Sequence, residues 1–171
     1  MAKKRDIFGI LSQFETAAPA GFAVALHIEY TTPRFLFQTY NQKWMEVYSS
    51  LGLVMKDPTV IWGFSNTGIV DWAELEDQDH AGVLALARDY GLAHGFTCAL
   101  TRDDSRSIAS FAHESRRFRE QEKSALSAAL QDLHEMTAAI DSLSAEQERQ
   151  LKLLSIAFTR GQEPGSTGSR A

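Results

Sequence analysis

Alternating apolar residues in two separate regions restrict the folds that this chain can adopt. Residues 22–30, FAVALHIEY, have the two-residue period of a strand, and one face of that strand is expected to carry Phe22, Val24, Leu26 and Ile28. After the turn residues TTP, residues 34–40, RFLFQTY, form a second extended segment rich in aromatic side chains. Residues 95–115 have the form of a hairpin with TRDDSR as its polar turn.

Helical periodicity flanks these strands. Apolar side chains recur three and four residues apart in four segments, residues 6–14, 42–51, 78–90 and 118–140. Asn41 is suited to cap the second of them. Residues 57–72 are predicted as a loop or short helix, with Asp57 capping whatever begins at Pro58. Strands in the middle with helices around them predict an α+β fold, in which an antiparallel sheet is sandwiched between helices (α-β-α).

Length, charge and cysteine content exclude several classes of protein. A chain of 171 residues has room for one domain with a short appendage. Its formal net charge of −5 provides no general attraction to nucleic acid, whose binding depends on lysine and arginine contacts to phosphate. Cys98 is the only cysteine, so neither an intrachain disulfide nor a cysteine-rich metal site can form. Because the sequence has no apolar run of about 18 residues and no signal-peptide cleavage pattern, we expect a cytoplasmic protein without a membrane span.

The sequence contains no recognisable catalytic or metal-binding pattern. Five histidines are scattered without metal-ligand spacing, at His27, His80, His94, His113 and His134. There is no GxSxG nucleophile motif, no P-loop and no GxGxxG motif. We therefore expect neither an enzyme nor a resident metal ion or cofactor.

An aromatic stripe followed by a carboxylate is the strongest sign of a binding site. Tyr40, Trp44 and Tyr48 are spaced four residues apart, as side chains on one helical face are, and such a stripe is most often core packing. The carboxylate of Asp57 is harder to reconcile with an apolar core, because burial penalises an unpartnered charge. Aromatic rings with O–H and N–H donors, together with an acceptor-only carboxylate, suit a small ligand with a polar head and an apolar tail. The candidates to hold that polar head are Tyr40, Trp44, Asp57, Thr59 and Trp72.

These residues and their spacing resemble the autoinducer-binding domain of LuxR-type quorum-sensing receptors, which bind N-acyl-homoserine lactones. The family pattern is a tyrosine, a tryptophan four residues on, a second tyrosine four further, Asp-Pro nine later, and a tryptophan fifteen past the aspartate. This chain keeps every interval, with Tyr40, Trp44, Tyr48, Asp57-Pro58 and Trp72. The resemblance extends over about residues 21–140 and implies a ligand pocket between the sheet and one helical layer.

The resemblance also implies polar roles for individual residues. Trp44 would donate its indole N–H to the lactone carbonyl, and Tyr40 would donate its hydroxyl to the acyl amide carbonyl. Asp57 would accept the amide N–H of the ligand in a charge-assisted hydrogen bond. Thr59 and Ser110 would add further polar contacts.

Other matching residues would shape the pocket. Trp72 and Tyr48 would form walls around the head group, and Pro58 and Gly95 would shape the backbone near it. Tyr48 and Gly95 could equally have purely structural roles. Ala99 stands where the family usually has proline, a departure that touches none of the polar contacts to the ligand.

The C-terminal part resembles only the beginning of the family's DNA-binding domain. We assign residues 1–142 to the autoinducer-binding domain. Residues 143–162 resemble the first helix of a helix-turn-helix domain, and residues 163–171, EPGSTGSRA, have the composition of a disordered tail. The scaffold and recognition helices of such a domain do not follow, so the expectation is a truncated regulator without direct DNA binding.

These features predict a receptor that binds an acyl-homoserine lactone and acts through another protein. It would form a homodimer, or a heterodimer with a full-length LuxR-type receptor, and inhibit that receptor by leaving the mixed dimer with one DNA-binding arm. Residues 118–140 are the candidate dimer surface, although their apolar stripe could equally be core. The alternatives are a ligand sink without a partner, or a GAF- or PAS-like sensor of another small molecule. A lactone-opening enzyme is disfavoured by the missing nucleophile and metal constellations.

Overall fold

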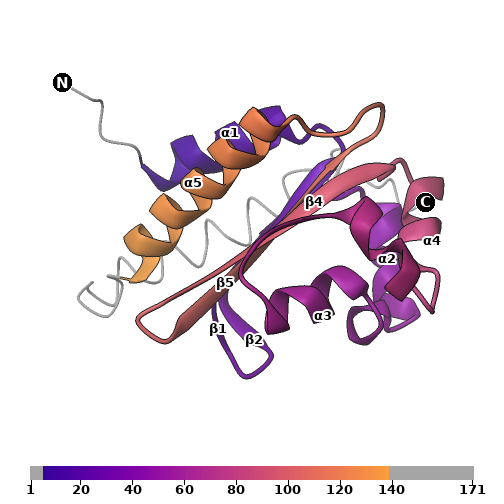
Figure 1. Ribbon diagram of the computed structural model, residues 1–171, viewed down its shortest axis with the longest axis horizontal. Coiled ribbons are helices and arrows are strands. Elements are labelled where there is room, and N and C mark those ends of the chain that lie inside the picture. Colours follow the sequence, from indigo (N-terminus) through magenta and orange to yellow (C-terminus); the bar gives the residue numbers. More distant parts are fainter. Residues whose placement is uncertain (1–5, 139–171) are drawn as a thin grey trace, which may run out of the picture.

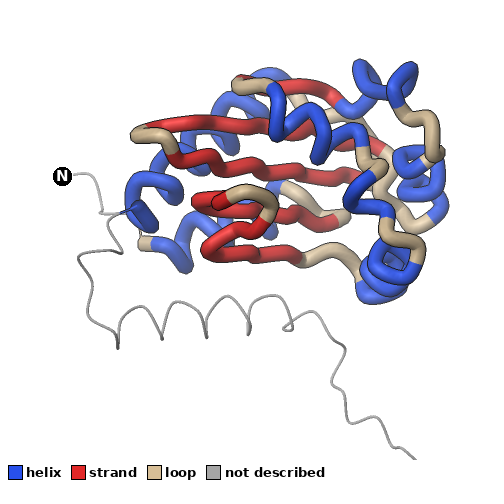
Figure 2. The backbone as a smooth tube through the Cα atoms, turned by 90° about the horizontal axis from the view of Figure 1, so that it is seen from below, coloured by secondary structure: helices blue, strands red, loops and turns tan. Residues whose placement is uncertain are grey.

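A five-stranded antiparallel sheet forms the centre of the computed structural model, which describes residues 6–138. Its strands lie side by side in the order β2-β1-β5-β4-β3 (Figure 2). The elements in chain order are α1 (Ile7–Ala17), β1 (Gly21–Glu29), β2 (Thr32–Gln38), α2 (Gln42–Ser50), the 3-10 turn η1 (Leu53–Met55), α3 (Pro58–Ser65), β3 (Gly68–Asp71), the 3-10 helix η2 (Trp72–Gln78), α4 (Val83–Asp89), β4 (His94–Arg102), β5 (Ser105–His113) and α5 (Glu120–Ala138). The predicted α+β class is confirmed.

Helices cover both faces of this sheet. α1 and α5 lie beside each other on one face, and α2, α3 and α4 lie on the other (Figure 1). Asp6 caps α1 by accepting a hydrogen bond from Gly9 N at 2.7 Å, and Asn41 caps α2 by accepting one from Trp44 N at 2.8 Å. The arrangement is the predicted α-β-α sandwich.

The sheet face beneath α1 and α5 carries a large aromatic core. Phe22 and Phe111 are paired across β1 and β5, and both pack around Phe14 of α1 in edge-to-face contacts. The apolar stripe of α5, including Leu126, Ala129, Leu130 and Leu133, is buried in this same core. Of the two interpretations of that stripe, core packing is therefore the one that the structure supports.

A β-bulge in β1 changes the face on which one predicted core residue lies. The pairing of β1 with β5 shifts register between Ala25 and Ile28, and His27 has a positive φ of 53°. The extra residue turns Ile28 toward the opposite side of the sheet from Leu26. The expectation that Ile28 shares a face with Phe22 is therefore wrong, because the bulge interrupts the alternation.

Two further segments differ from the sequence-based expectations. Residues 57–72, expected as a loop or short helix, contain both α3 and the edge strand β3. The helix expected over residues 78–90 begins only at Val83, because Asp79 accepts hydrogen bonds from Val83 N at 2.7 Å and Leu84 N at 2.9 Å and so starts a new helix.

The proposed domain boundary lies beyond the part of the chain that the structure describes. The predicted helix of residues 143–162 and the tail of residues 163–171 both fall outside residues 6–138. Within residues 6–138, no helix combines the length and the apolar character needed to span a membrane.

Candidate ligand-binding site

A cavity of about 300 Å³ lies between the sheet and the layer that contains α2, α3 and α4. Its lining is mainly apolar, with a small number of polar side chains. All seven side chains predicted to bind a ligand line it, namely Tyr40, Trp44, Tyr48, Asp57, Thr59, Trp72 and Ser110. Tertiary packing thus brings residues from α2, α3, η2, β5 and the segment after β2 together around one cavity, as in small-molecule sites.

Asp57 begins α3 and also faces the cavity. As the N-cap of that helix, it accepts hydrogen bonds at Oδ1 from Thr59 N at 2.9 Å and from Thr59 Oγ1 at 2.7 Å. Pro58 occupies the first helical turn, where its missing N–H leaves no bond unmade. The Tyr48 hydroxyl donates to Oδ2 of Asp57 at 2.8 Å. The predicted cap is confirmed, and the carboxylate is held in place before any ligand enters.

The surroundings of Asp57 determine which groups at this site carry protons. Burial raises the pKa of Asp57, and the hydrogen bonds from Thr59 and Tyr48 offset that increase only in part. Burial also raises the pKa values of Tyr40 and Tyr48, and the charge of Asp57 raises them further. Both phenols therefore remain protonated donors across the physiological pH range.

Tyr40 occupies a different kind of position from the one its spacing predicts. It lies between β2 and α2, before the N-cap Asn41, so it does not share a helical face with Trp44. Its ring packs over Gly21, where an added Cβ would lie 2.7 Å from Tyr40 Cδ1. Its hydroxyl is 3.5 Å from the Ser110 carbonyl oxygen, which leaves that donor only weakly engaged.

Trp44 and Tyr48 do lie on one face of α2. Their ring centroids are 5.6 Å apart, and Trp44 lies equally far from Tyr90. Trp44 is only 3% exposed, yet its indole N–H has no hydrogen-bond acceptor within residues 6–138. A donor in this position is available to a ligand.

Trp72 forms one wall of the cavity and is fixed by contacts with β4. Its Nε1–H donates to Thr97 Oγ1 at 3.0 Å, and Thr97 Oγ1 is 2.7 Å from Ser110 Oγ. The ring lies directly on Gly95, where an added Cβ would be 2.5 Å from Trp72 Cδ2. A side chain at position 95 would therefore displace this ring.

The sheet floor of the cavity was not predicted from the sequence. Ala23 is paired with Ser110 and Gln38, and Ala25 is paired with Ile108 and Leu36, so these rows cross β5, β1 and β2. The two alanines lie in the cavity lining, and their small side chains leave room above the sheet. A signal existed in FAVALHIEY, where large residues alternate with alanine, because alternate side chains face opposite sides of a strand.

Thr97 is a second residue that the sequence did not single out. It is fully buried and connects Trp72 to Ser110. The only sequence feature that could have identified Thr97 is its polar side chain within the otherwise apolar run GFTCAL. Among residues 6–138, no three His, Cys, Asp or Glu side chains gather closely enough to hold a metal ion.

Comparisons with known proteins identify the domain. Residues 14–141 match the family model described as autoinducer binding domain. The transcriptional activator protein SolR of Ralstonia nicotianae is 37% identical over 60 residues, which are 35% of this chain and 25% of SolR. The chain thus spans about a quarter of the length of that curated relative.

Solved structures show the same fold at low sequence identity. The N-acylhomoserine lactone dependent LuxR family transcription factor CepR2 of Burkholderia cenocepacia has a TM-score of 0.59 and 16% identity, over 77% of this chain and 86% of that one. SdiA in complex with octanoyl-rac-glycerol also has a TM-score of 0.59 and 16% identity, over 94% of this chain and 74% of that one. At this identity the likeness concerns the fold alone.

Proposed function

The chain belongs to the autoinducer-binding domain family of LuxR-type quorum-sensing regulators, and on that basis we propose that its cavity binds an N-acyl-homoserine lactone. The observation that carries the proposal is the convergence of Tyr40, Trp44 and Asp57 on one mainly apolar cavity. A lactone ring joined to an amide and an acyl tail requires such an arrangement, with few directional polar groups and a large apolar surface.

The polar groups around the cavity suit an amide and a lactone. Asp57 Oδ2 accepts from Tyr48 and retains capacity for a ligand amide N–H, because a carboxylate oxygen has two lone pairs. The indole N–H of Trp44 would donate to the lactone carbonyl, and the hydroxyl of Tyr40 would donate to the acyl carbonyl. If Thr97 donates to Ser110, the Ser110 hydroxyl proton is directed to the ligand. Thr59 and Trp72 complete the enclosure.

The apolar remainder of the cavity suits an acyl chain. Ala23 and Ala25 provide a low floor, while Ile28, Leu36 and Phe64 line its sides. Leu36 is 43% exposed and Phe64 is 38% exposed, so this part of the lining reaches the protein surface. This apolar lining favours a ligand with an extended acyl tail over a short polar molecule.

Thermal melting of the purified protein with a panel of lactones tests this proposal. A ligand that binds only the folded state stabilises it by about 2.7 kcal/mol at one hundred times its dissociation constant. We expect the midpoint to rise with lactone concentration and to depend on acyl length. Ring-opened acyl-homoserines with the same tails are the matched controls. Equal shifts with the ring-opened compounds, or none with any lactone, would refute lactone recognition.

A second ligand class is favoured by one comparison. SdiA was solved with octanoyl-rac-glycerol, an acyl ester without a lactone or an amide. A medium-chain monoacylglycerol would fill the same apolar space; it has no N–H, but its glycerol hydroxyl groups are donors that Asp57 can accept. Octanoylglycerol therefore belongs in the panel.

For the regulatory role, we propose inhibition of a full-length LuxR-type receptor through mixed dimers in the cytoplasm. Two operator half-sites bound together gain affinity by effective concentration, so a dimer with one DNA-binding arm binds much more weakly. Co-expression of the 171-residue protein with a tagged full-length receptor, with and without lactone, tests this role. Recovery of mixed dimers with reduced operator binding is expected. If only homodimers are recovered and operator binding is unchanged, the inhibitory role is rejected, and a ligand sink without a partner is the remaining role.

A further inference from the structure

Lys123 is a buried lysine in the first turn of α5 that ligand contacts do not explain. Its side chain is 10% exposed. The start of a helix is also an unfavourable place for a cation, because the helix dipole is positive there. Burial lowers the pKa of Lys123, but hydrogen bonds to Asp71 and Glu120 raise it above the ordinary value, so the side chain is charged. A buried charge in such a position requires a partner.

That partner is Asp71, the last residue of the edge strand β3. Lys123 Nζ donates to Asp71 Oδ2 at 2.9 Å, and the Asp71 side chain is 16% exposed. Glu120 also contacts Lys123, at 3.2 Å, but its side chain is 90% exposed. The buried pair with Asp71 therefore joins α5, on one face of the sheet, to the end of the edge strand β3.

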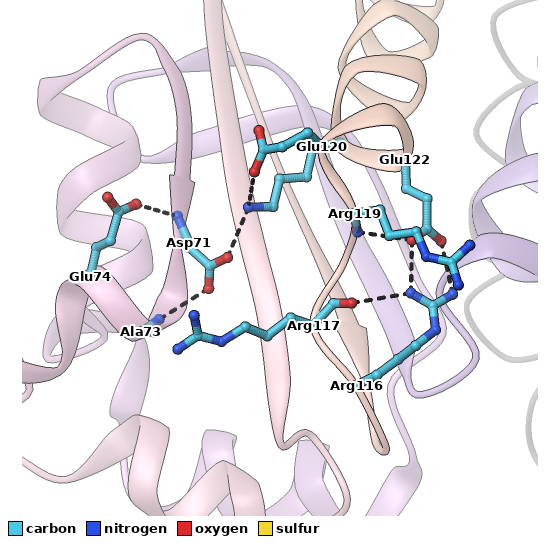
Figure 3. A network of polar contacts seen from close by, with 9 residues as sticks. Asp71, Ala73, Glu74, Arg116, Arg117, Arg119, Glu120 and Glu122 are labelled. Atoms are coloured by element: carbon cyan, nitrogen blue, oxygen red, sulfur yellow. Dashed lines mark hydrogen bonds and ion pairs between the residues drawn. The ribbon is translucent and has the colours of Figure 1, made fainter.

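Asp71 in turn determines how η2 begins. Its carboxylate accepts a hydrogen bond from Ala73 N at 3.3 Å, and its backbone N–H donates to Glu74 Oε2 at 2.9 Å (Figure 3). Together these contacts form a capping box, which sets the direction in which the helix leaves the strand. The first residue of that helix is Trp72, the wall of the cavity.

We propose that Lys123 is a positioning residue for ligand binding, because it fixes the Asp71 cap and thereby holds Trp72 against the cavity. This inference rests on the proposed function of the cavity. Lys123 itself is not part of the cavity lining and acts through Asp71. Because coupling is reciprocal, a ligand that contacts Trp72 also stabilises the attachment of α5 to β3.

The test compares Lys123→Met with wild type in two measurements. The first is the position of the Trp72 indole N–H resonance in ligand-free protein, assigned by its loss in Trp72→Phe. The second is the dissociation constant for the best lactone in the panel. We expect a displaced or broadened Trp72 resonance, and an affinity lower by roughly tenfold, as for coupled residues in one hydrogen-bond network.

Three further variants separate positioning from general loss of stability. Arg88→Met breaks another ion pair to η2, between Arg88 and Glu76, in which both side chains are about half exposed, and it should change neither measurement. Lys123→Arg should restore both. In the Asp71→Asn background, Lys123→Met should change lactone affinity and the Trp72 resonance little further, because the ion pair through which Lys123 acts on Trp72 is already lost.

The outcomes distinguish this inference from the proposed function. An unchanged Trp72 resonance and unchanged affinity in folded Lys123→Met would overturn the positioning role while lactone binding stands. If wild type binds no lactone, the proposed function fails, and the role of Lys123 in ligand binding fails with it. If wild type binds no lactone but Lys123→Met still displaces the Trp72 resonance, Lys123 affects only the structure of the cavity wall.

Discussion

Asp57 serves two purposes that compete for the same carboxylate. It caps α3 through Thr59 and it faces the cavity beside Tyr48. Its raised pKa means that the folded state holds the proton more tightly than the unfolded state. The ionised form therefore reduces folding stability as pH rises from the ordinary aspartate pKa through the folded one. Ionised Asp57 lowers folding stability, and capping alone does not need the charge, because asparagine caps a helix about as well. The proposed recognition of a ligand N–H gives the charge a purpose.

Asp57→Asn should separate these two purposes. Asparagine caps helices about as well as aspartate, so we expect the free energy of unfolding of the empty protein to change by no more than about 1 kcal/mol. Lactone affinity should fall at least roughly tenfold, because a hydrogen bond to a charged group contributes about 1.5–3 kcal/mol. Calorimetric titration and thermal melting measure the two quantities.

The matched control is Asp6→Asn, which makes the same change at the N-cap of α1, outside the cavity lining. It should leave lactone affinity unchanged. Equal affinity losses in the two variants, or full affinity in Asp57→Asn, would contradict the role of the charge.

At the scale of elements, the two faces of the central strands differ in packing density, because one face borders the cavity and the other borders the aromatic core. On β1, Ala25 lines the cavity, whereas Val24 belongs to the aromatic core beneath α1 and α5. On β5, Ala109 is paired with Val24 and faces that core. One alanine thus borders empty space, and the other borders densely packed side chains, where added volume causes strain.

This difference predicts contrasting effects for one substitution at two positions. Ala109→Leu should destabilise the protein by about 1–3 kcal/mol, as overpacking of a filled core does. Ala25→Leu should leave the unfolding free energy unchanged or raised, because filling a cavity is commonly stabilising by about 0.5–2 kcal/mol. It should weaken long-chain lactones more than short-chain ones. Denaturant unfolding and the lactone panel measure both effects, and equal destabilisation by the two variants would show that the cavity floor is packed.

Across the whole molecule, α5 is attached to the sheet near both ends of its described length. Lys123 binds Asp71 near the start. Near the other end, His27 at the bulge of β1 lies against His134, with ring centroids 4.3 Å apart. His27 Nε2 is within 2.9 Å of Thr137 Oγ1, and Ser107 Oγ is 2.7 Å from His134 Nδ1. Because two adjacent imidazolium ions would repel each other, this buried polar cluster disfavours a positive charge on both rings at once.

Acid should therefore weaken the attachment of α5. Burial and, as a smaller cause, the charge of the nearby His27 lower the pKa of His134 to about 4. The unfolded chain thus binds more protons between the ordinary value of 6.5 and about 4, so stability is lost as pH falls through this window. A hydrogen bond with the Arg102 backbone and the charge of Asp103 raise the pKa of His134, whereas the charge of the Arg102 side chain lowers it. That side chain is itself paired with Glu135.

Thermal midpoints measured from pH 7 to pH 4 test this dependence. His134→Asn retains a polar atom near Ser107 but cannot gain a proton, so its midpoint should fall less steeply over that window. Parallel curves for the variant and wild type would assign the acid sensitivity to other groups.

Local sequence patterns predicted the parts of this protein that neighbouring residues control. The caps at Asn41 and Asp57, the stripe of α5 and, apart from the bulge before Ile28, the strand periods follow from contacts within a few residues, and each lies where the pattern indicated. The residue types of Tyr40, Trp44, Tyr48, Asp57 and Trp72 allowed a ligand site, but spacing alone favoured core packing. The resemblance to a family is what favoured the ligand site.

Other features depended on residues far apart in the chain. The bulge at His27, the strand status of residues 68–71 and the contact of Thr97 with Trp72 all arise from pairing with distant strands. The partner of Lys123 is Asp71, which is 52 residues away in the chain, at the end of the edge strand β3. No local period encodes such contacts, because strand register and the size of a cavity are settled only when the layers pack together.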